Sequence, residues 1–247
     1  MILELDLGNT SAKWRIIDGD GRISERGSGA VAAWLSSALP AQWHHGLQRI
    51  RVGSVLDRDA EAAFAERLDA MLGVSAEFAR SGASCAGVQN IYADPGRLGV
   101  DRWLALVAAY QSHRDAVMVV DIGTALTVDV ADSAGRHLGG YIIPGLQLMQ
   151  TALLGGTDAV RFDLQSDLRE LGLGSDTASC VQNGVAAALT GAVLVARRQA
   201  ELALGRIPAI VVAGGGGTML AERLFSLGCE VEVEQDLVLD GLRWALP

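Results

Sequence analysis

The chain begins with MILELDLGNTSAKWRII (residues 1–17), in which two apolar runs flank a short polar turn. This pattern predicts a β-hairpin, because the first run ends at Asp6 and the second begins at Lys13. Gly8 lets the backbone approach a ligand closely, and the N–H groups of such a turn can bind an anion. An ordinary structural turn has the same composition, so this hairpin alone leaves both alternatives open.

The turn carries polar side chains of two kinds. Asn9, Thr10 and Ser11 offer hydrogen-bond donors to an anionic ligand. Asp6 is different, because a carboxylate beside a phosphate is repulsive unless a cation lies between them. A metal ion with oxygen ligands would remove that repulsion.

The hairpin pattern occurs a second time, at residues 117–143 (VMVVDIGTALTVDVADSAGRHLGGYII). DIGT at 121–124 aligns with DLGN at 6–9, and DSAG at 132–135 aligns with DGDG at 18–21. A repeat of this length fixes the architecture. We therefore expect an α/β protein with two similar halves, residues 1–115 and 116–247, whose two glycine turns face one cleft.

Composition excludes several functional classes. The formal charge is −9, which argues against nucleic acid and anionic membranes, since both require basic residues. The three cysteines are widely spaced, which favours reduced thiols in a cytosolic protein over disulfides or a zinc site. No basic and apolar leader is evident at the start of the sequence, and the most apolar stretch, 185–196, is too short to cross a bilayer.

An irregular segment, SGASCAGVQNIYADPGRLG (residues 81–99), follows a predicted helix at 59–72 and a strand at 74–79. A loop of this length in a compact domain is more often functional than not. It leads into a helix that begins with VDRW, so Asp101 lies in the first turn. Asp101 is either a helix cap or a catalytic carboxylate, and Arg102 beside it could hold a substrate carboxylate or phosphate.

The C-terminal half contains a long helix, predicted at about 179–203, that is apolar nearly all round. Such a helix is expected to be buried, and in a chain of this size it suggests packing against a second subunit. Ser175, Asp176 and Thr177 are each possible N-caps for it. The preceding segment, 155–174, has no clear pattern and could be mobile.

A glycine run, residues 214–217, separates a predicted strand at 209–213 from a helix at 219–226. A strand, glycine turn and helix in this order let the backbone approach an anionic ligand. The run matches neither the dinucleotide-binding fingerprint nor the phosphate-binding loop of Walker-type ATPases, so it is a weak signal alone.

Five motifs in order resemble the type III pantothenate kinases: DLGNT at 6–10, GVDRW at 99–103, DIGT at 121–124, GGYIIPG at 139–145 and AGGG at 213–216. The resemblance covers nearly the whole chain. It implies an actin-like ATPase fold, with two ribonuclease-H-like halves around a central ATP cleft. It also implies a cytoplasmic homodimer that phosphorylates pantothenate to 4'-phosphopantothenate, the first step of coenzyme A biosynthesis.

The resemblance also implies residue roles. Asp101 matches the general base. The implied ATP contacts are Asp6, Gly8, Asn9, Thr10, Ser11, Lys13, Thr124, Gly214 and Gly215. The implied pantothenate contacts are Tyr92, Gly99, Val100, Arg102 and Thr177, the last reaching the substrate of the other subunit. Asp121 matches the site of a monovalent cation, K⁺ or NH₄⁺, and Asp6 would act on Mg²⁺ through water.

Two alternatives to this function stay open. The first is another kinase or phosphatase on the same fold, acting on a sugar or a polyphosphate. The second is a non-catalytic nucleotide-binding regulator, because family resemblance does not guarantee activity. The presence of all three aspartates, Asp6, Asp101 and Asp121, favours an active enzyme.

Overall fold

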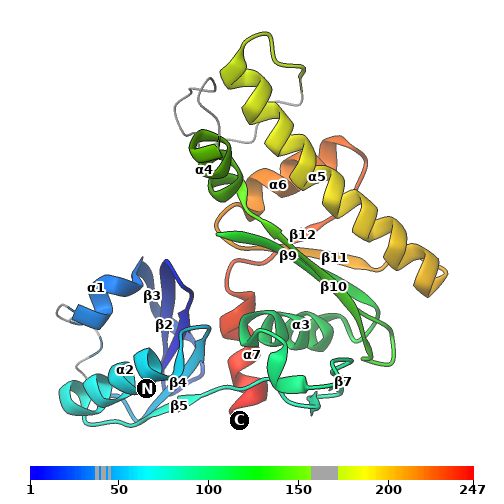
Figure 1. Ribbon diagram of the computed structural model, residues 1–247. Helices are drawn as coiled ribbons and strands as arrows, with labels where there is room; N and C mark the ends of the chain where they lie inside the picture. Colours follow the sequence, from blue (N-terminus) through cyan, green and yellow to red (C-terminus); the bar gives the residue numbers. More distant parts are fainter. Residues whose placement is uncertain (37–38, 40–42, 44–45, 157–171) are drawn as a thin grey trace. The chain divides into compact units, whose positions relative to one another are not determined.

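The computed structural model describes residues 1–36, 39, 43, 46–156 and 172–247. Within these residues the chain divides into two compact units, each containing a five-stranded sheet (Figure 1). Unit 1 comprises Met1–Ala86, Tyr92–Ala108 and Leu237–Pro247, and unit 2 comprises Gly87–Ile91 and Ala109–Asp236. This division differs from the predicted one, 1–115 and 116–247, in that residues 87–91 and 109–115 belong to unit 2 and residues 237–247 to unit 1.

The sheet of unit 1 has the order β3-β2-β1-β4-β5. Strands β1 (Ile2–Leu7), β2 (Ser11–Ile17) and β3 (Ile23–Ala30) form an antiparallel meander, as the opening hairpin predicts. Strands β4 (Arg49–Ser54) and β5 (Ala76–Phe78) add in parallel beyond β1. Helix α1 (Val31–Ser36) follows β3, and α2 (Arg58–Leu72) joins β4 to β5.

The two faces of this sheet differ because side chains alternate along each strand. Leu3, Leu5 and Leu7 point into a core that includes Phe64 and Leu68 of α2. Glu4 lies on the other face and is fully buried, and its carboxylate accepts hydrogen bonds from Arg15 at 2.7 Å and Arg51 at 3.2 Å. A buried carboxylate needs such partners, since an unpaired charge in the interior is strongly destabilising.

The C-terminal helix α7 (Leu237–Ala245) covers this second face by packing on β1 and β4. Asp240 accepts a 2.6 Å hydrogen bond from Arg15, which thereby bridges two carboxylates. This ion pair, together with the packing of α7, is why the C-terminal segment belongs to unit 1.

Unit 2 repeats the same topology, which confirms the predicted repeat. Its sheet has the order β10-β9-β8-β11-β12. Strands β8 (Val117–Ile122), β9 (Ala125–Ala131) and β10 (His137–Pro144) form the meander, and β11 (Ala209–Ala213) and β12 (Glu232–Val233) add in parallel. Its helices are α4 (Leu146–Gly156), α5 (Thr177–Leu204) and α6 (Gly217–Ser226), and α3 (Val100–His113) runs from unit 1 into unit 2.

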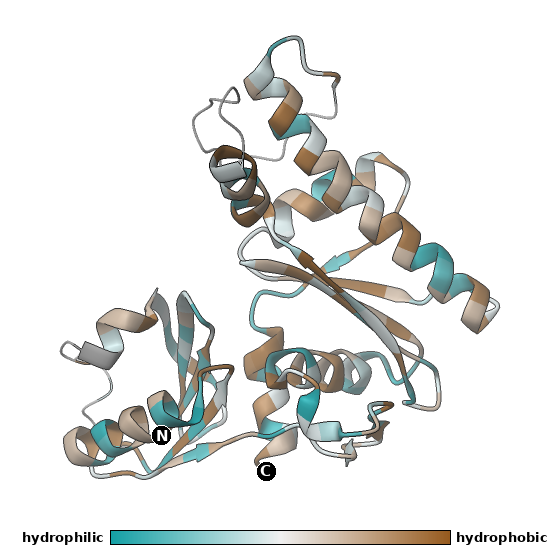
Figure 2. Cartoon of the chain, in the orientation of Figure 1, coloured by the Kyte–Doolittle hydropathy of each residue, from teal (hydrophilic) through white to brown (hydrophobic). Residues whose placement is uncertain are grey.

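The prediction that the long helix is buried all round is wrong. In α5, the buried side chains follow helical spacing along one face, from Val185 to Ala200. Ala187 and Ala188 are exposed, and on the same helix Val195 is 54% and Leu202 60% exposed. On the remaining face of α5, apolar side chains up to Val195 are left uncovered by the described residues, as the hydrophobic colouring of several turns indicates (Figure 2). The exposed Arg198 and Gln199 make its last turns polar.

The apolar stretch at 185–196, predicted to be too short to cross a bilayer, belongs to a longer helix. Helix α5 extends over 28 residues between the cap at Asp176 and Gly205, and in the described part of the chain it alone meets the length and hydropathy required. Core helices of soluble proteins meet the same criterion, and α5 packs on α4, α6 and the sheet of unit 2. Of the patternless segment 155–174, residues 157–171 lie outside the described residues.

Candidate functional site

The first glycine turn joins β1 to β2 at residues 8–10. The N–H of Gly8 donates to the carbonyl of Ser11 at 3.1 Å, and a Cβ at position 8 would lie only 2.8 Å from that carbonyl oxygen. The turn therefore requires glycine. Asn9, Thr10 and Ser11 are exposed. The carbonyl of Thr10 accepts a hydrogen bond from the backbone N–H of Val31, which ties the turn to the start of α1.

Strand register places Asp6 and Lys13 as direct neighbours on one face of the sheet. Asp6 also neighbours Gly53 on β4. A Cβ at Gly53 would lie 2.9 Å from a methyl group of Leu104 in α3, so α3 lies against this same face. Unit 1 thus places Asp6 and the helix that carries Asp101 on one side of its sheet.

The N-terminus of α3 is shaped around the carboxylate of Asp101. Its Oδ1 accepts a 2.8 Å hydrogen bond from the backbone N–H of Arg102, and it would lie 2.6 Å from a Cβ at Gly99. Glycine at position 99 leaves the space that this carboxylate occupies. Helix α3 begins at the buried Val100, so Asp101 lies inside the first turn and satisfies one of its N–H groups.

The structure brings Tyr92 and Arg102 together, although they lie on different elements. Arg102 is buried, and its Nη1 donates to the hydroxyl of Tyr92 at 3.2 Å. Arg102 directly follows Asp101, and just before Gly99 the carbonyl of Leu98 accepts a 2.7 Å hydrogen bond from the hydroxyl of Ser81. That bond closes the base of the 81–99 loop, which contains a short hairpin (β6, Ser84–Cys85, and β7, Val88–Gln89) and a 3₁₀ turn at Pro95–Arg97.

The second glycine turn, residues 123–124 between β8 and β9, is held by two other glycine segments of unit 2. Gly145 donates to the carbonyl of Thr124 at 2.9 Å, and Gly216 donates to the carbonyl of Ile122 at 3.1 Å. A Cβ at Gly145 would lie 2.4 Å from the carbonyl oxygen of Gly123. Sequence reasoning did not select Gly145 as a site residue, although its position directly after Pro144 was the available signal.

The structure places Asp121 against the run of glycines that follows β11. A Cβ at Gly214 would lie 2.5 Å from Oδ1 of Asp121 and 2.4 Å from the carbonyl oxygen of Ile122, and Gly214 has φ +87°. Gly215 lies in the same turn before α6. The carbonyl oxygen of Ile122 and Oδ1 of Asp121 therefore lie close to the backbone of Gly214, an approach that only glycine allows. Carboxylate and carbonyl oxygens are the ligand types that suit a hard cation.

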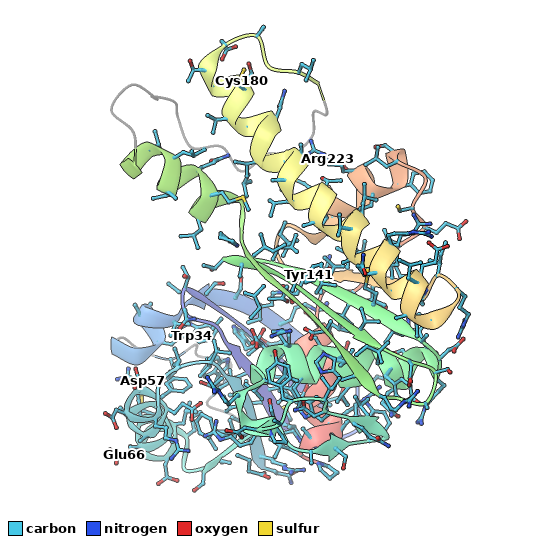
Figure 3. All side chains as sticks on the ribbon, turned by 45° about the vertical axis from the view of Figure 1, so that its right-hand side comes forward. Trp34, Asp57, Glu66, Tyr141, Cys180 and Arg223 are labelled. Carbon is cyan, nitrogen blue, oxygen red and sulfur yellow. The ribbon has the colours of Figure 1, made fainter. Side chains whose placement is uncertain are left out.

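Thr177 lies at the other end of unit 2, as the first residue of α5. The N-cap is Asp176, whose carboxylate accepts from the N–H of Ser179 at 3.0 Å, and these bonds hold the pKa of Asp176 below its ordinary value. The hydroxyl of Thr177 is therefore not needed as the cap. It borders an apolar hollow of about 840 Å³ between α4 and α5, which Cys180 also lines. Figure 3 labels Cys180 near the start of α5.

The candidate residues thus form two groups, each placed by the structure within its own unit. Unit 1 holds the first glycine turn with Asp6 and Lys13, and Tyr92, Gly99, Asp101 and Arg102. Unit 2 holds Asp121, Thr124, Gly214 and, on a separate helix, Thr177. Duplicated units with matching sheets and matching strand–glycine turn–strand hairpins define the class: proteins of the actin-like ATPase fold, which includes many kinases.

Comparison with solved structures supports this class. A putative 2-dehydro-3-deoxygalactonokinase from Sinorhizobium meliloti has a TM-score of 0.59 and 15% identity, covering 98% of this chain and 97% of that chain. A conserved putative Baf family transcriptional activator from Campylobacter jejuni has a TM-score of 0.60 and 20% identity, covering 98% and 95%. At these identities the likeness shows the fold alone.

Sequence comparison identifies the family. Residues 2–198 match the family model described as type III pantothenate kinase. The chain is 38% identical over 250 residues to the type III pantothenate kinase of Pseudomonas aeruginosa (strain LESB58), covering 100% of this chain and 99% of that protein. This chain therefore belongs to the type III pantothenate kinase family, and the resemblance read from its motifs is confirmed.

Proposed function

We propose that the protein transfers the γ-phosphoryl group of ATP to the primary hydroxyl of pantothenate, giving 4'-phosphopantothenate, the first step of coenzyme A biosynthesis. The observation that carries this proposal is the arrangement of unit 1. Asp6, at a glycine turn suited to phosphates, lies on the sheet face against which α3 packs, and α3 begins with Asp101. Phosphoryl transfer needs this combination of a phosphate site and a nearby proton acceptor.

In the proposed reaction Asp101 is the general base. It accepts the proton of the attacking hydroxyl and orients that hydroxyl toward the γ-phosphate. Arg102 pairs with the pantothenate carboxylate, and its bond to Tyr92 holds the guanidinium in place. Gly99 and Val100 line the remainder of the substrate site, where glycine allows close approach.

The ATP side of the proposal uses both glycine turns. The N–H groups and side chains of Gly8, Asn9, Thr10 and Ser11 would contact the phosphates, with Lys13 adding positive charge next to Asp6. Thr124, Gly214 and Gly215 would contact ATP from unit 2. Asp6 would hold Mg²⁺ through water molecules. A bound Mg²⁺ would neutralise negative charge on the triphosphate. Asp121, whose Oδ1 lies close to the backbone of Gly214 and near the carbonyl oxygen of Ile122, would hold the monovalent cation.

An ADP-release assay with a panel of acceptors tests the proposed function. The panel contains pantothenate, other hydroxylated acids, several sugars and polyphosphate, each with ATP, Mg²⁺ and K⁺. We expect rapid ADP release with pantothenate alone, and a product whose mass is that of 4'-phosphopantothenate. Release with a sugar but not pantothenate would identify another kinase of this fold. ATP binding without release for any acceptor would identify a nucleotide-binding regulator.

The proposal includes a cytoplasmic homodimer, supported by the uncovered face of α5. An apolar helix face of this length needs a cover, and a second copy of an acidic, water-soluble kinase is a better cover than an anionic bilayer. The hollow between α4 and α5 borders that face. Thr177, which lines this hollow, would reach the pantothenate bound in the other subunit.

We expect Thr177→Ala to raise the KM for pantothenate about three- to tenfold, the effect of losing one hydrogen bond of about 1 kcal/mol. The KM for ATP should stay unchanged. Ser175→Ala is the matched control, because it removes a nearby exposed hydroxyl that does not line the hollow. Light scattering at micromolar concentration should give the mass of a dimer, and a fully active monomer would refute this part of the proposal.

A further inference from the structure

The 81–99 loop is divided between the two units. Its flanks belong to unit 1, where Ser81 is bonded to Leu98 and Arg80 forms a two-bond ion pair with Glu61 on α2. Its tip, Gly87–Ile91, belongs to unit 2. The base of the loop is thus fixed, and the path of its tip depends on what the tip packs against.

The tip packs against the turn between β9 and β10, residues 132–136. The backbone N–H of Gln89 donates to the carbonyl of Gly135 at 2.8 Å, and Gln89 forms a parallel bridge with Arg136. Gly135 has φ +79°, and a Cβ there would lie 2.2 Å from the carbonyl oxygen of Gly87 and 3.1 Å from the ring of Tyr110. Only glycine allows so close an approach of two backbone segments.

The corresponding turn of unit 1, residues 18–22, provides an internal comparison. In both turns the aspartate accepts from two backbone N–H groups at 2.9 Å, and the glycine donates back to the carbonyl of that aspartate. Gly21, the counterpart of Gly135, also has φ +79°. Around a Cβ at Gly21, however, no atom of the described residues lies within 4 Å. The crowding at Gly135 therefore comes from the loop tip and not from the turn itself.

We propose that the turn at residues 132–136 is a docking seat that sets the position of the 81–99 loop for substrate binding, with Gly135 as its positioning residue. The inference rests on the proposed function, since its readout is pantothenate binding. Tyr92 follows Gln89 by three residues and meets Arg102. Because the loop base is pinned at Leu98, a displaced tip must move the residues between them, which include Tyr92.

The test compares Gly135→Ala with Gly21→Ala. Both substitutions impose the same backbone strain at φ +79°, but only the first meets the carbonyl oxygen of Gly87. For Gly135→Ala we expect the KM for pantothenate to rise about tenfold or more, since small misplacements of positioning groups are costly. The KM for ATP should change less than about twofold, and Gly21→Ala should leave both within about twofold.

Amide hydrogen exchange gives a readout independent of activity. The Gln89 amide should exchange slowly in the parent and in Gly21→Ala, and at least about tenfold faster in Gly135→Ala, because its bond to position 135 is lost. If the Gln89 amide exchanges at the same rate in Gly135→Ala as in the parent, the turn at residues 132–136 does not hold the loop, and the proposal is refuted. Faster exchange with an unchanged pantothenate KM would overturn the role of that turn in substrate binding.

A second matched pair covers the case in which Gly135→Ala does not fold. Asp132→Ala and Asp18→Ala each remove the carboxylate that organises its turn, without adding atoms. Only Asp132→Ala should raise the pantothenate KM and speed Gln89 exchange; equal effects of the two would refute the proposal. If the parent does not phosphorylate pantothenate, the proposed function fails, and Gln89 exchange alone decides whether the seat exists.

Discussion

Replacing Asp101 with asparagine is expected to reduce turnover by about a hundredfold or more, the loss typical of a removed general base. The melting temperature and the affinity for ATP should stay close to those of the parent. Asparagine still offers an oxygen to the N–H of Arg102, and Gly99 leaves room for it as it does for the carboxylate. The amide cannot accept the proton of the attacking hydroxyl, so only the chemical step should suffer.

Steady-state kinetics and thermal melting together separate the two possible roles of Asp101. If it were only a helix-terminal residue, its replacement would cost about 1 kcal/mol of stability or less and leave turnover unchanged. Asp57→Asn is the matched control, because Asp57 caps α2 by accepting from Ala60 at 2.9 Å and has no proposed part in the chemistry. Near-parental turnover in Asp101→Asn would show that the base lies elsewhere.

Activity should also fall by about a hundredfold when sodium or tetramethylammonium is the only monovalent cation. This is the loss in rate typical of removing one group that stabilises charge in the transition state. Potassium or ammonium should restore it. The expected ligand is the Asp121 carboxylate, which lies with the Ile122 carbonyl close to the backbone of Gly214. A cation there would offset negative charge near the transferring phosphoryl group. Potassium and ammonium lose their water more readily than sodium, whereas the methyl groups of tetramethylammonium prevent direct contact with oxygen ligands.

The assay is run at fixed ionic strength and saturating Mg²⁺, so that only the identity of the monovalent cation changes. Asp121→Asn should weaken activation by potassium by raising the concentration required, because one full charge is lost at the site. The matched control is Asp115→Asn, an aspartate of the same unit that pairs with Arg206 and has no proposed part in binding or chemistry. Equal rates in all four cations would contradict the cation site.

Local sequence signals were sufficient to predict the strand pattern of both units. DLGN and DIGT each mark a turn between two antiparallel strands, because an apolar run, a glycine and a second run specify a hairpin locally. Helix α2 was predicted to within one residue at its start, since Asp57 caps it and Gly73 ends it in a left-handed conformation. The family motifs also selected residues that the structure brings together, such as Tyr92 and Arg102.

Features that depend on distant residues could not be predicted from local patterns. The burial of α5 was overestimated, because a helix that is apolar on every face gives no sign of which face will be covered. Gly135 was recognised as part of a repeat, but its contact with Gly87 depends on the path of another loop. Nothing near residue 240 indicates that its carboxylate pairs with Arg15.

The return of α7 to unit 1 has a consequence for how the protein is made. The ribosome delivers Asp240 225 residues after Arg15, so the first unit cannot complete its interior until α7 has been synthesised. A nascent chain stopped before residue 237 would leave Arg15 with one of its two carboxylates missing, and Gly53 and Leu104 without Val238 and Leu242 over them. Limited proteolysis of such stalled chains should cut in β1, β2 or β4, so the loss of α7 would destabilise strands that are made more than 180 residues earlier.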